Sequence, residues 1–194
     1  MSELQGKNKL LEQYQKQIRT GMDQAADMLS NFLEAGSDFY ILPLNDSESA
    51  QNDLQNESLA GICLKVEGAV DGSILLLFAE EDARRLAGLL MRQATPENLE
   101  SDQMRSTLQE VGNIFASGVL SSLDDRLNLR AMPSPPSFLL GTSQQIQDSC
   151  RENSPHRETL MVESKLNCSA GHDLLFEGSV FFQISTSSLK QFNS

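Results

Sequence analysis

The sequence contains no tryptophan, only three cysteines and no long run of apolar residues. Its densest apolar stretch, residues 74–78, is far shorter than the roughly 20 residues that a membrane-spanning helix needs. The N-terminal residues are polar and lack the apolar segment of a signal peptide. We therefore expect a cytoplasmic protein without a membrane-spanning helix.

The three cysteines, Cys63, Cys150 and Cys168, form an odd set without close spacing, which favours reduced thiols over a disulfide framework. Cys63 and Cys168 lie in strand-like stretches, where a free cysteine is usually a small apolar core residue. Cys168 and His172 could share a metal ion, but no further ligands accompany them. The sequence therefore predicts no metal site.

Basic residues are also few, and the formal net charge of the chain is −12. Nucleic-acid binding requires a stripe of lysine and arginine that neutralises phosphates, and no such stripe is visible. An anionic membrane surface is disfavoured for the same reason. At 194 residues, the chain has the size of one domain and can bury a substantial core without disulfides or metals.

Apolar periodicity and turn residues predict the secondary structure. Helices are expected at residues 8–35 (ended by Gly36), from residue 80, at residues 102–126, over part of 138–147 and as a last turn at 188–192. Strands are expected at residues 38–42, 62–68, 72–78, 128–132, 159–167 and 174–184, and loops at 45–57 and 149–155. The strand at 72–78 is continuously apolar, which indicates a central position with both faces buried.

The same order of elements occurs twice, in halves of about residues 8–92 and 100–192. An offset of 94 residues superposes apolar positions of the two long helices, such as Ala25 on Val119 and Leu29 on Leu123. The economical architecture is an α/β (α+β) fold in which the two halves share one sheet and the long helices pack on it. We therefore predict a single domain over residues 1–194 with pseudo-two-fold symmetry.

A polar stripe runs along the helix expected at residues 102–126. At about 100° per residue, Ser106, Glu110, Asn113 and Ser117 fall on one side of this helix, opposite its apolar residues. Glu110 and Asn113 are three apart, so their side chains can reach one target together. A polar stripe is typical of any surface helix, however, and its spacing alone does not indicate a site.

Two glycines in this helix are unusual, because each costs about 1 kcal/mol relative to alanine. Gly112 and Gly118 indicate either close packing or the approach of something large, although simple tolerance of glycine is an alternative.

The segment from Ser106 to Leu120, followed by residues 129–136, resembles the phosphatase motif of the CheC/CheX/FliY family of chemotaxis proteins. That motif is Asp or Ser, three residues, Glu, two residues, Asn, twenty-two residues and Pro, and Ser106, Glu110, Asn113 and Pro136 fit every interval. Residues 72–90 also resemble the strand and helix that precede the motif in CheC proteins. The resemblance covers about residues 10–190.

The resemblance implies a phosphatase that hydrolyses the aspartyl-phosphate of a CheY-type response regulator. Asn113 would hold the attacking water, because a carboxamide both donates and accepts hydrogen bonds without titrating. Glu110 would pair with a lysine of the regulator, and Ser106 and Pro136 would support the site. The regulator would supply Mg²⁺, so the protein would need no cofactor or metal of its own.

CheC proteins usually carry a second copy of the motif on the first helix, and this sequence departs from that pattern. At an offset of 94, Lys16 and Arg19 correspond to Glu110 and Asn113; at an offset of 93, Gln17 and Thr20 do. Neither alignment gives a Glu/Asn pair. We therefore expect one active face per chain.

Other functions stay open at this stage. The fold could serve as a non-catalytic adaptor or flagellar-switch component, or act on a response regulator outside chemotaxis. In CheC proteins a small helix of the second half docks the deamidase CheD, and residues 138–148 would supply that surface here. The duplicated layout favours a monomer over the dimer of CheX-type relatives.

Overall fold

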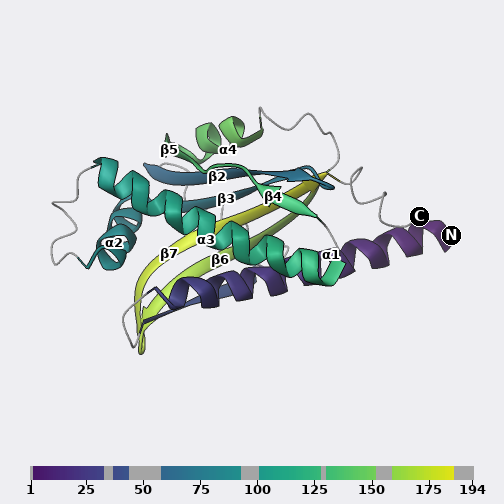
Figure 1. The fold of residues 1–194 in the computed structure, drawn as a ribbon, viewed down its shortest axis with the longest axis horizontal. Helices are drawn as coiled ribbons and strands as arrows, with labels where there is room; N and C mark the ends of the chain where they lie inside the picture. Colours follow the sequence, from purple (N-terminus) through teal and green to yellow (C-terminus); the bar gives the residue numbers. More distant parts are fainter. Residues whose placement is uncertain are drawn as a thin grey trace.

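The computed structural model describes residues 2–32, 37–43, 58–92, 101–127, 130–151 and 159–185 (Figure 1). The first half contains α1 (Ser2–Ser30), β1 (Ser37–Pro43), β2 (Leu59–Gly68), β3 (Gly72–Ala79) and α2 (Glu80–Leu90). The second half contains α3 (Ser101–Leu127), β4 (Ala131–Pro133), β5 (Ser137–Gly141), α4 (Ser143–Arg151), β6 (Thr159–Ala170) and β7 (Asp173–Ser185). None of the described helices combines the length and apolarity needed to cross a membrane.

The strands form one antiparallel sheet in the order β1-β6-β7-β3-β2-β4, with β5 also paired to β2. This order is symmetric when the two halves are exchanged. The last strands of the halves, β3 and β7, pair at the centre, whereas β1 pairs with β6 of the other half and β4 with β2 of the other half. The predicted mixed fold, with two halves sharing one sheet, is confirmed.

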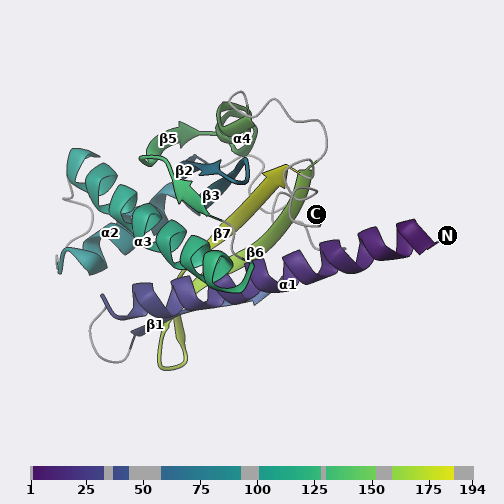
Figure 2. The same ribbon diagram turned by 45° about the vertical axis from the view of Figure 1, so that its right-hand side comes forward.

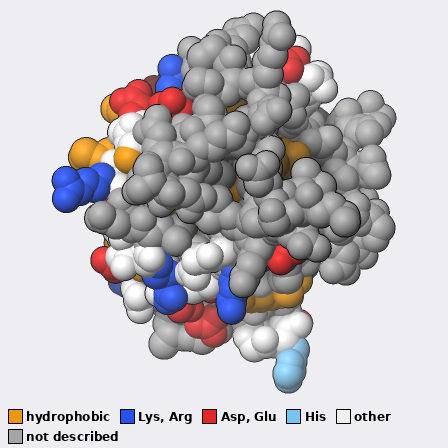
Figure 3. Space-filling model, turned by 90° about the vertical axis from the view of Figure 1, so that its right-hand side faces the viewer, with side chains coloured by type: hydrophobic (Ala, Val, Ile, Leu, Met, Phe, Trp, Pro, Cys, Tyr) orange, Lys and Arg blue, Asp and Glu red, His pale blue; other side chains and the backbone are white. Residues whose placement is uncertain are grey.

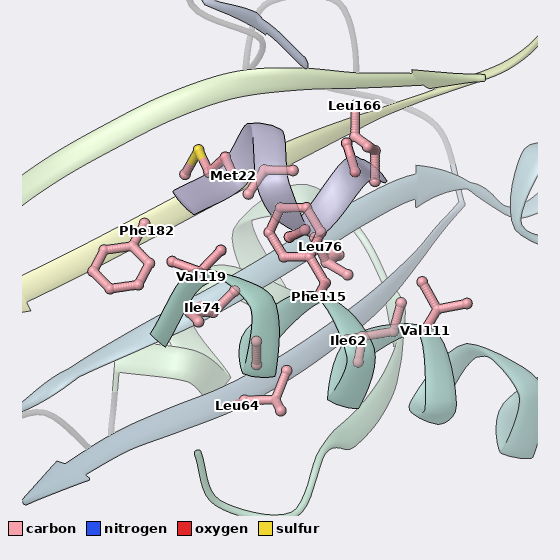
Figure 4. Close-up of a cluster of buried hydrophobic side chains, with 14 of the residues drawn as sticks. Met22, Ile62, Leu64, Ile74, Leu76, Val111, Phe115, Val119, Leu166 and Phe182 are labelled. Atoms are coloured by element: carbon pink, nitrogen blue, oxygen red, sulfur yellow. The ribbon is translucent and has the colours of Figure 1, made fainter. Parts of the chain in front are cut away.

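The two long helices lie side by side on one face of the sheet (Figures 1 and 2). They run antiparallel: a Cβ built on Gly118 would meet Ala25, and one built on Gly21 would meet Ser122. Beneath them lies the main apolar core, in which Met22, Phe115 and Phe182 are fully buried (Figure 4). The strand β3 is buried on both faces, as its continuously apolar sequence predicts.

A second, smaller core lies on the opposite face of the sheet, under α4. Ile146 and Cys150 of α4 contact outward-facing residues of the central strands there, among them Leu75, Leu77 and Phe181. Cys63 of β2 and Cys150 form a disulfide, so the expectation that these two thiols are reduced is wrong. The two cysteines are 87 residues apart, and only the packing of α4 on β2 brings them together. Cys168 is free and buried in the main core, as predicted.

The segment between β4 and α4 differs most from the sequence-based prediction. β5 occupies the start of the region where a short helix was expected, because residues 137–141 pair with β2, with Phe138 opposite Ile62. The helix α4 begins at Ser143 and extends to Arg151, into the expected loop at 149–155. The remaining part of that loop, residues 152–155, lies outside the described residues.

The first helix also has different bounds, beginning at Ser2 and ending at Ser30 rather than spanning residues 8–35. Near its end, the Ser30 hydroxyl accepts a hydrogen bond from the backbone N–H of Phe39 (2.8 Å), which ties the helix to β1. The expected helix stop at Gly36, the loop at 45–57, the start of the strand at 128–129 and the last helical turn at 188–192 lie outside the described residues.

Candidate functional site

The helix α3 exposes the polar stripe and buries the residues opposite it. Ser106, Glu110 and Ser117 are exposed, and Asn113 is half-buried. The apolar positions on the other side are fully or almost fully buried: Leu108, Val111, Phe115, Val119 and Leu123. Helical spacing alone therefore predicts correctly which side of α3 faces solvent.

Glu110 and Asn113 are neighbours on this exposed surface. The Asn113 side-chain amide donates to the Glu110 carboxylate, with 3.4 Å between Nδ2 and Oε2. A hydrogen bond of this length is weak, and water competes with it at an exposed position. The pair therefore presents a carboxylate and a carboxamide that can both turn to one external target.

Pro136 lies beside the same helix, although it is 23 positions after Asn113 in the sequence. Its carbonyl oxygen accepts a hydrogen bond of 2.8 Å from Nε2 of Gln109. A Cβ built on Gly112 would lie 3.6 Å from the Pro136 Cβ, which is ordinary van der Waals contact. The fold thus brings all four motif residues to α3 and its immediate flank.

The segment that carries Pro136 is also fixed to the sheet. Ser134 donates its backbone N–H to the Lys65 carbonyl (2.8 Å), and the Ser134 hydroxyl accepts from the Lys65 N–H (2.9 Å). After Pro136, the Phe138 ring lies under the Arg105 guanidinium at 5.7 Å. Contacts with β2 and α3 therefore hold this segment from two sides.

Sequence reasoning missed Gln109, Arg105 and Ser134, which make these contacts. Each is an ordinary polar residue on a helix or between prolines, and no local pattern marks Arg105 or Ser134. Only Gln109 has a sequence signal at all, since it lies four positions before Asn113 and therefore faces the same side of the helix.

The unusual glycines of α3 are explained by close packing. A Cβ on Gly112 would come within 2.6 Å of Ile62 on β2, and a Cβ on Gly118 within 2.8 Å of the Ala25 Cα on α1. Figure 4 shows α3 lying over the β2 side chains, with Val111 and Phe115 pointing into the core. These two glycines bring α3 close to its neighbours within the fold.

The corresponding surface of α1 carries different chemistry. Lys16 is exposed, and Gln17, Arg19 and Thr20 are half-buried. The Thr20 hydroxyl donates back to the Lys16 carbonyl at 3.0 Å, within the helix. No carboxylate–carboxamide pair occupies these four positions.

Lysine and arginine are interspersed with acidic side chains on the coloured part of the face in Figure 3. Within the described ranges, no group of three or more His, Cys, Asp or Glu residues could hold a metal ion. Cys168 is buried, whereas His172 is exposed at the turn between β6 and β7.

Comparisons with known proteins relate the chain to chemotaxis proteins. A family model described as chemotaxis phosphatase CheX matches residues 60–156, half of the chain, which includes α3 and Pro136. A Halobacterium salinarum protein, named as a candidate CheY-P phosphatase, CheC1, is 27% identical over 152 residues, covering 77% of this chain and 78% of that protein.

Solved structures show the same fold. FliY of Thermotoga maritima matches with a TM-score of 0.66 and 16% identity, over 95% of this chain and 93% of FliY. A chain of the CheX–CheY–BeF3–Mg²⁺ complex from Borrelia burgdorferi matches with a TM-score of 0.56 and 18% identity, over 85% of this chain and 95% of that one.

Proposed function

Because this chain belongs to the CheC/CheX/FliY family of chemotaxis proteins, we propose that it hydrolyses the aspartyl-phosphate of a CheY-type response regulator. The observation that carries the proposal is the exposed Glu110–Asn113 pair on α3, with Pro136 held beside it. The Borrelia burgdorferi complex contains CheX together with CheY, BeF3 and Mg²⁺, which supports a CheY-type partner for this chain.

Asn113 is the proposed catalytic residue. Hydrolysis of an acyl phosphate requires a water molecule in line with the departing carboxylate, and positioning supplies most of the catalysis in phosphoryl transfer. The Asn113 carboxamide can accept from this water through its oxygen and donate through its nitrogen, without changing protonation state. The weak bond to Glu110 is easily exchanged for such contacts.

Glu110 is the proposed anchor. Its carboxylate is exposed on the same face as Asn113 and can form an ion pair with the lysine of the regulator's active site. One turn earlier, Ser106 is exposed and supports the edge of this interface, and Pro136 lies against Gly112, the residue directly before Asn113. We expect the regulator to supply Mg²⁺, so that this chain contributes no metal or cofactor of its own.

Only the α3 face is expected to be active. At the corresponding place on α1, the cationic side chains of Lys16 and Arg19 would repel the lysine and Mg²⁺ of a regulator. We propose a monomer with one site per chain, acting in the cytoplasm. Docking of CheD at the small helix α4 stays an expectation from the family resemblance.

A non-catalytic adaptor or flagellar-switch module is the second candidate. The fold match to FliY, with a TM-score of 0.66, fits this candidate as well as it fits the phosphatase, because a shared fold does not fix the activity. Such a module would bind a phosphorylated regulator without accelerating the loss of its phosphate.

Release of inorganic phosphate distinguishes the two candidates. A panel of purified CheY-type regulators is charged with acetyl phosphate and Mg²⁺, freed of excess donor, and followed with and without this protein. The phosphatase is expected to accelerate release from at least one regulator at substoichiometric amounts. Binding without acceleration, even at equimolar protein, would instead support the adaptor.

A further inference from the structure

Gln109 lies directly before Glu110 and one helical turn before Asn113. Residues four apart on a helix are neighbours, and glutamine and asparagine at this spacing can hydrogen-bond to each other. In an isolated helix, the Gln109 amide would therefore compete with a bound water for the Asn113 carboxamide. The fold must direct Gln109 elsewhere if Asn113 is to hold that water.

The Pro136 carbonyl provides the alternative partner. It accepts from Gln109 Nε2 at 2.8 Å, a distance typical of a strong neutral hydrogen bond, whereas Asn113 interacts with Glu110 at 3.4 Å. Gln109 is half-buried beside the loop, so its bond to Pro136 is better shielded from water than the exposed Glu110–Asn113 contact.

The acceptor itself is rigidly placed. Two hydrogen bonds between Ser134 and Lys65 fasten the segment to β2, and the rings of Pro135 and Pro136 fix two backbone φ angles. On its other side, Pro136 rests against Gly112, the residue directly before Asn113. Gln109 therefore donates to a carbonyl that does not follow the motions of the helix surface.

We propose that Gln109 is a positioning residue: its bond to the Pro136 carbonyl ties the helix turn that carries Asn113 to the fixed segment and keeps the Gln109 amide away from the Asn113 carboxamide, which stays available for the attacking water. The inference rests on the proposed phosphatase function and gives the motif proline a physical task. Pro136 contributes its carbonyl and its rigid backbone, and Gln109 connects both to the helix turn that carries Asn113.

Kinetics of Gln109→Met and Gln109→Glu test this role. Methionine keeps the length of the side chain but cannot donate; glutamate cannot donate to the Pro136 carbonyl and can accept from Asn113. Both variants are expected to lower kcat about tenfold, because both lose the bond that ties the Asn113 helix turn to Pro136 and only the glutamate also competes for the Asn113 amide, while KM for the phosphorylated regulator changes less than about twofold. Gln13→Met, on the exposed side of α1, is the matched control and should keep the wild-type kcat.

Three kinetic outcomes would overturn the proposal: unchanged kcat in both Gln109 variants, a raised KM with unchanged kcat, or an equal loss in Gln13→Met. Thermal unfolding of each variant identifies a loss that comes from an unfolded protein. If one Gln109 variant is unfolded at the assay temperature, the other Gln109 variant alone decides the test.

A second measurement does not depend on activity. In NMR spectra of the whole chain, the side-chain amide resonances of Asn113 should shift in Gln109→Met and stay in place in Gln13→Met. If the wild-type protein accelerates no regulator, the phosphatase function fails while the resonances still report on the contact. Unchanged Asn113 resonances in Gln109→Met would overturn the positioning role whatever the activity.

Discussion

Pro136 lies against Gly112, with 3.6 Å between the Pro136 Cβ and the place that a Cβ on Gly112 would take. On its other side, Gly112 meets Ile62 of the sheet even more closely. One helix position thus contacts both the core and the segment that flanks Asn113. Because residue 112 has no side chain, α3 can lie close both to the sheet and to the segment that carries Pro136.

Gly112→Ala is expected to destabilise the protein despite the better helix propensity of alanine. The gain from propensity is about 1 kcal/mol, whereas the new methyl group would lie 2.6 Å from the buried, β-branched Ile62 and force a shift that costs about 1–3 kcal/mol. Chemical denaturation should show a net loss of unfolding free energy. Ser117→Ala, exposed on the same helix, is the control. Equal or greater stability of Gly112→Ala would contradict the packing described for α3.

Labelling with a thiol reagent should distinguish the three cysteines. Burial, with a smaller contribution from the charge of Asp38, raises the pKa of Cys168 to about 12, so at pH 8 about one thiol in ten thousand is ionised. Purified without reductant, the native protein should take up no label, the denatured protein one, and the denatured and reduced protein three, counted by mass spectrometry. Three labels on the denatured, unreduced protein would show that Cys63 and Cys150 are thiols.

The ionised Asp82 carboxylate is expected to lower the free energy of unfolding at neutral pH. Burial is the main cause that raises the pKa of this carboxyl, against smaller lowering effects that include Arg85. A pKa above the unfolded value means that the ionised form costs stability at high pH, and that this cost disappears as pH falls through the folded pKa. The unfolding free energy of Asp82→Asn should therefore exceed that of the wild type near pH 7. The two values should converge towards pH 3. A difference that grows as pH falls would contradict this sign.

Restoring the motif on α1 should not restore a second site. Lys16→Glu with Arg19→Asn supplies the two side chains but not the supporting contacts that Gln109 and Pro136 make on α3. Introduced into an Asn113→Ala background, the pair is expected to give less than about a tenth of wild-type phosphate release. Activity near the wild-type level would mean that the Glu/Asn pair alone, without the supporting contacts, is sufficient for phosphate release.

The sequence predicts those parts of the fold that depend on local periodicity. The spacing of Leu108 and Phe115 correctly identifies the buried side of α3, and the continuously apolar β3 correctly indicates a central strand. Both signals arise because a helix or strand must bury one side or both, and this requirement is visible within a short window of residues.

Long-range contacts account for what the sequence did not reveal. Residues 137–141 form a strand because β2 offers them an edge, and Cys150 meets Cys63 because α4 then folds over the opposite face. The bond from Gln109 to Pro136 likewise joins positions 27 apart. No local pattern determines such pairs, so the motif spacing indicated that Pro136 matters without showing what it contacts.

The most direct test of the central claim is a paired measurement on Asn113→Ala: the rate of phosphate release from a charged CheY-type regulator, and the affinity for that regulator with its phosphate mimicked by BeF3. We predict that phosphate release falls to the spontaneous rate of the regulator alone while the affinity stays within about threefold of wild type, because alanine removes the water-holding carboxamide but leaves the Glu110 anchor. Wild-type release by Asn113→Ala would contradict the assignment of the chemistry to this side chain.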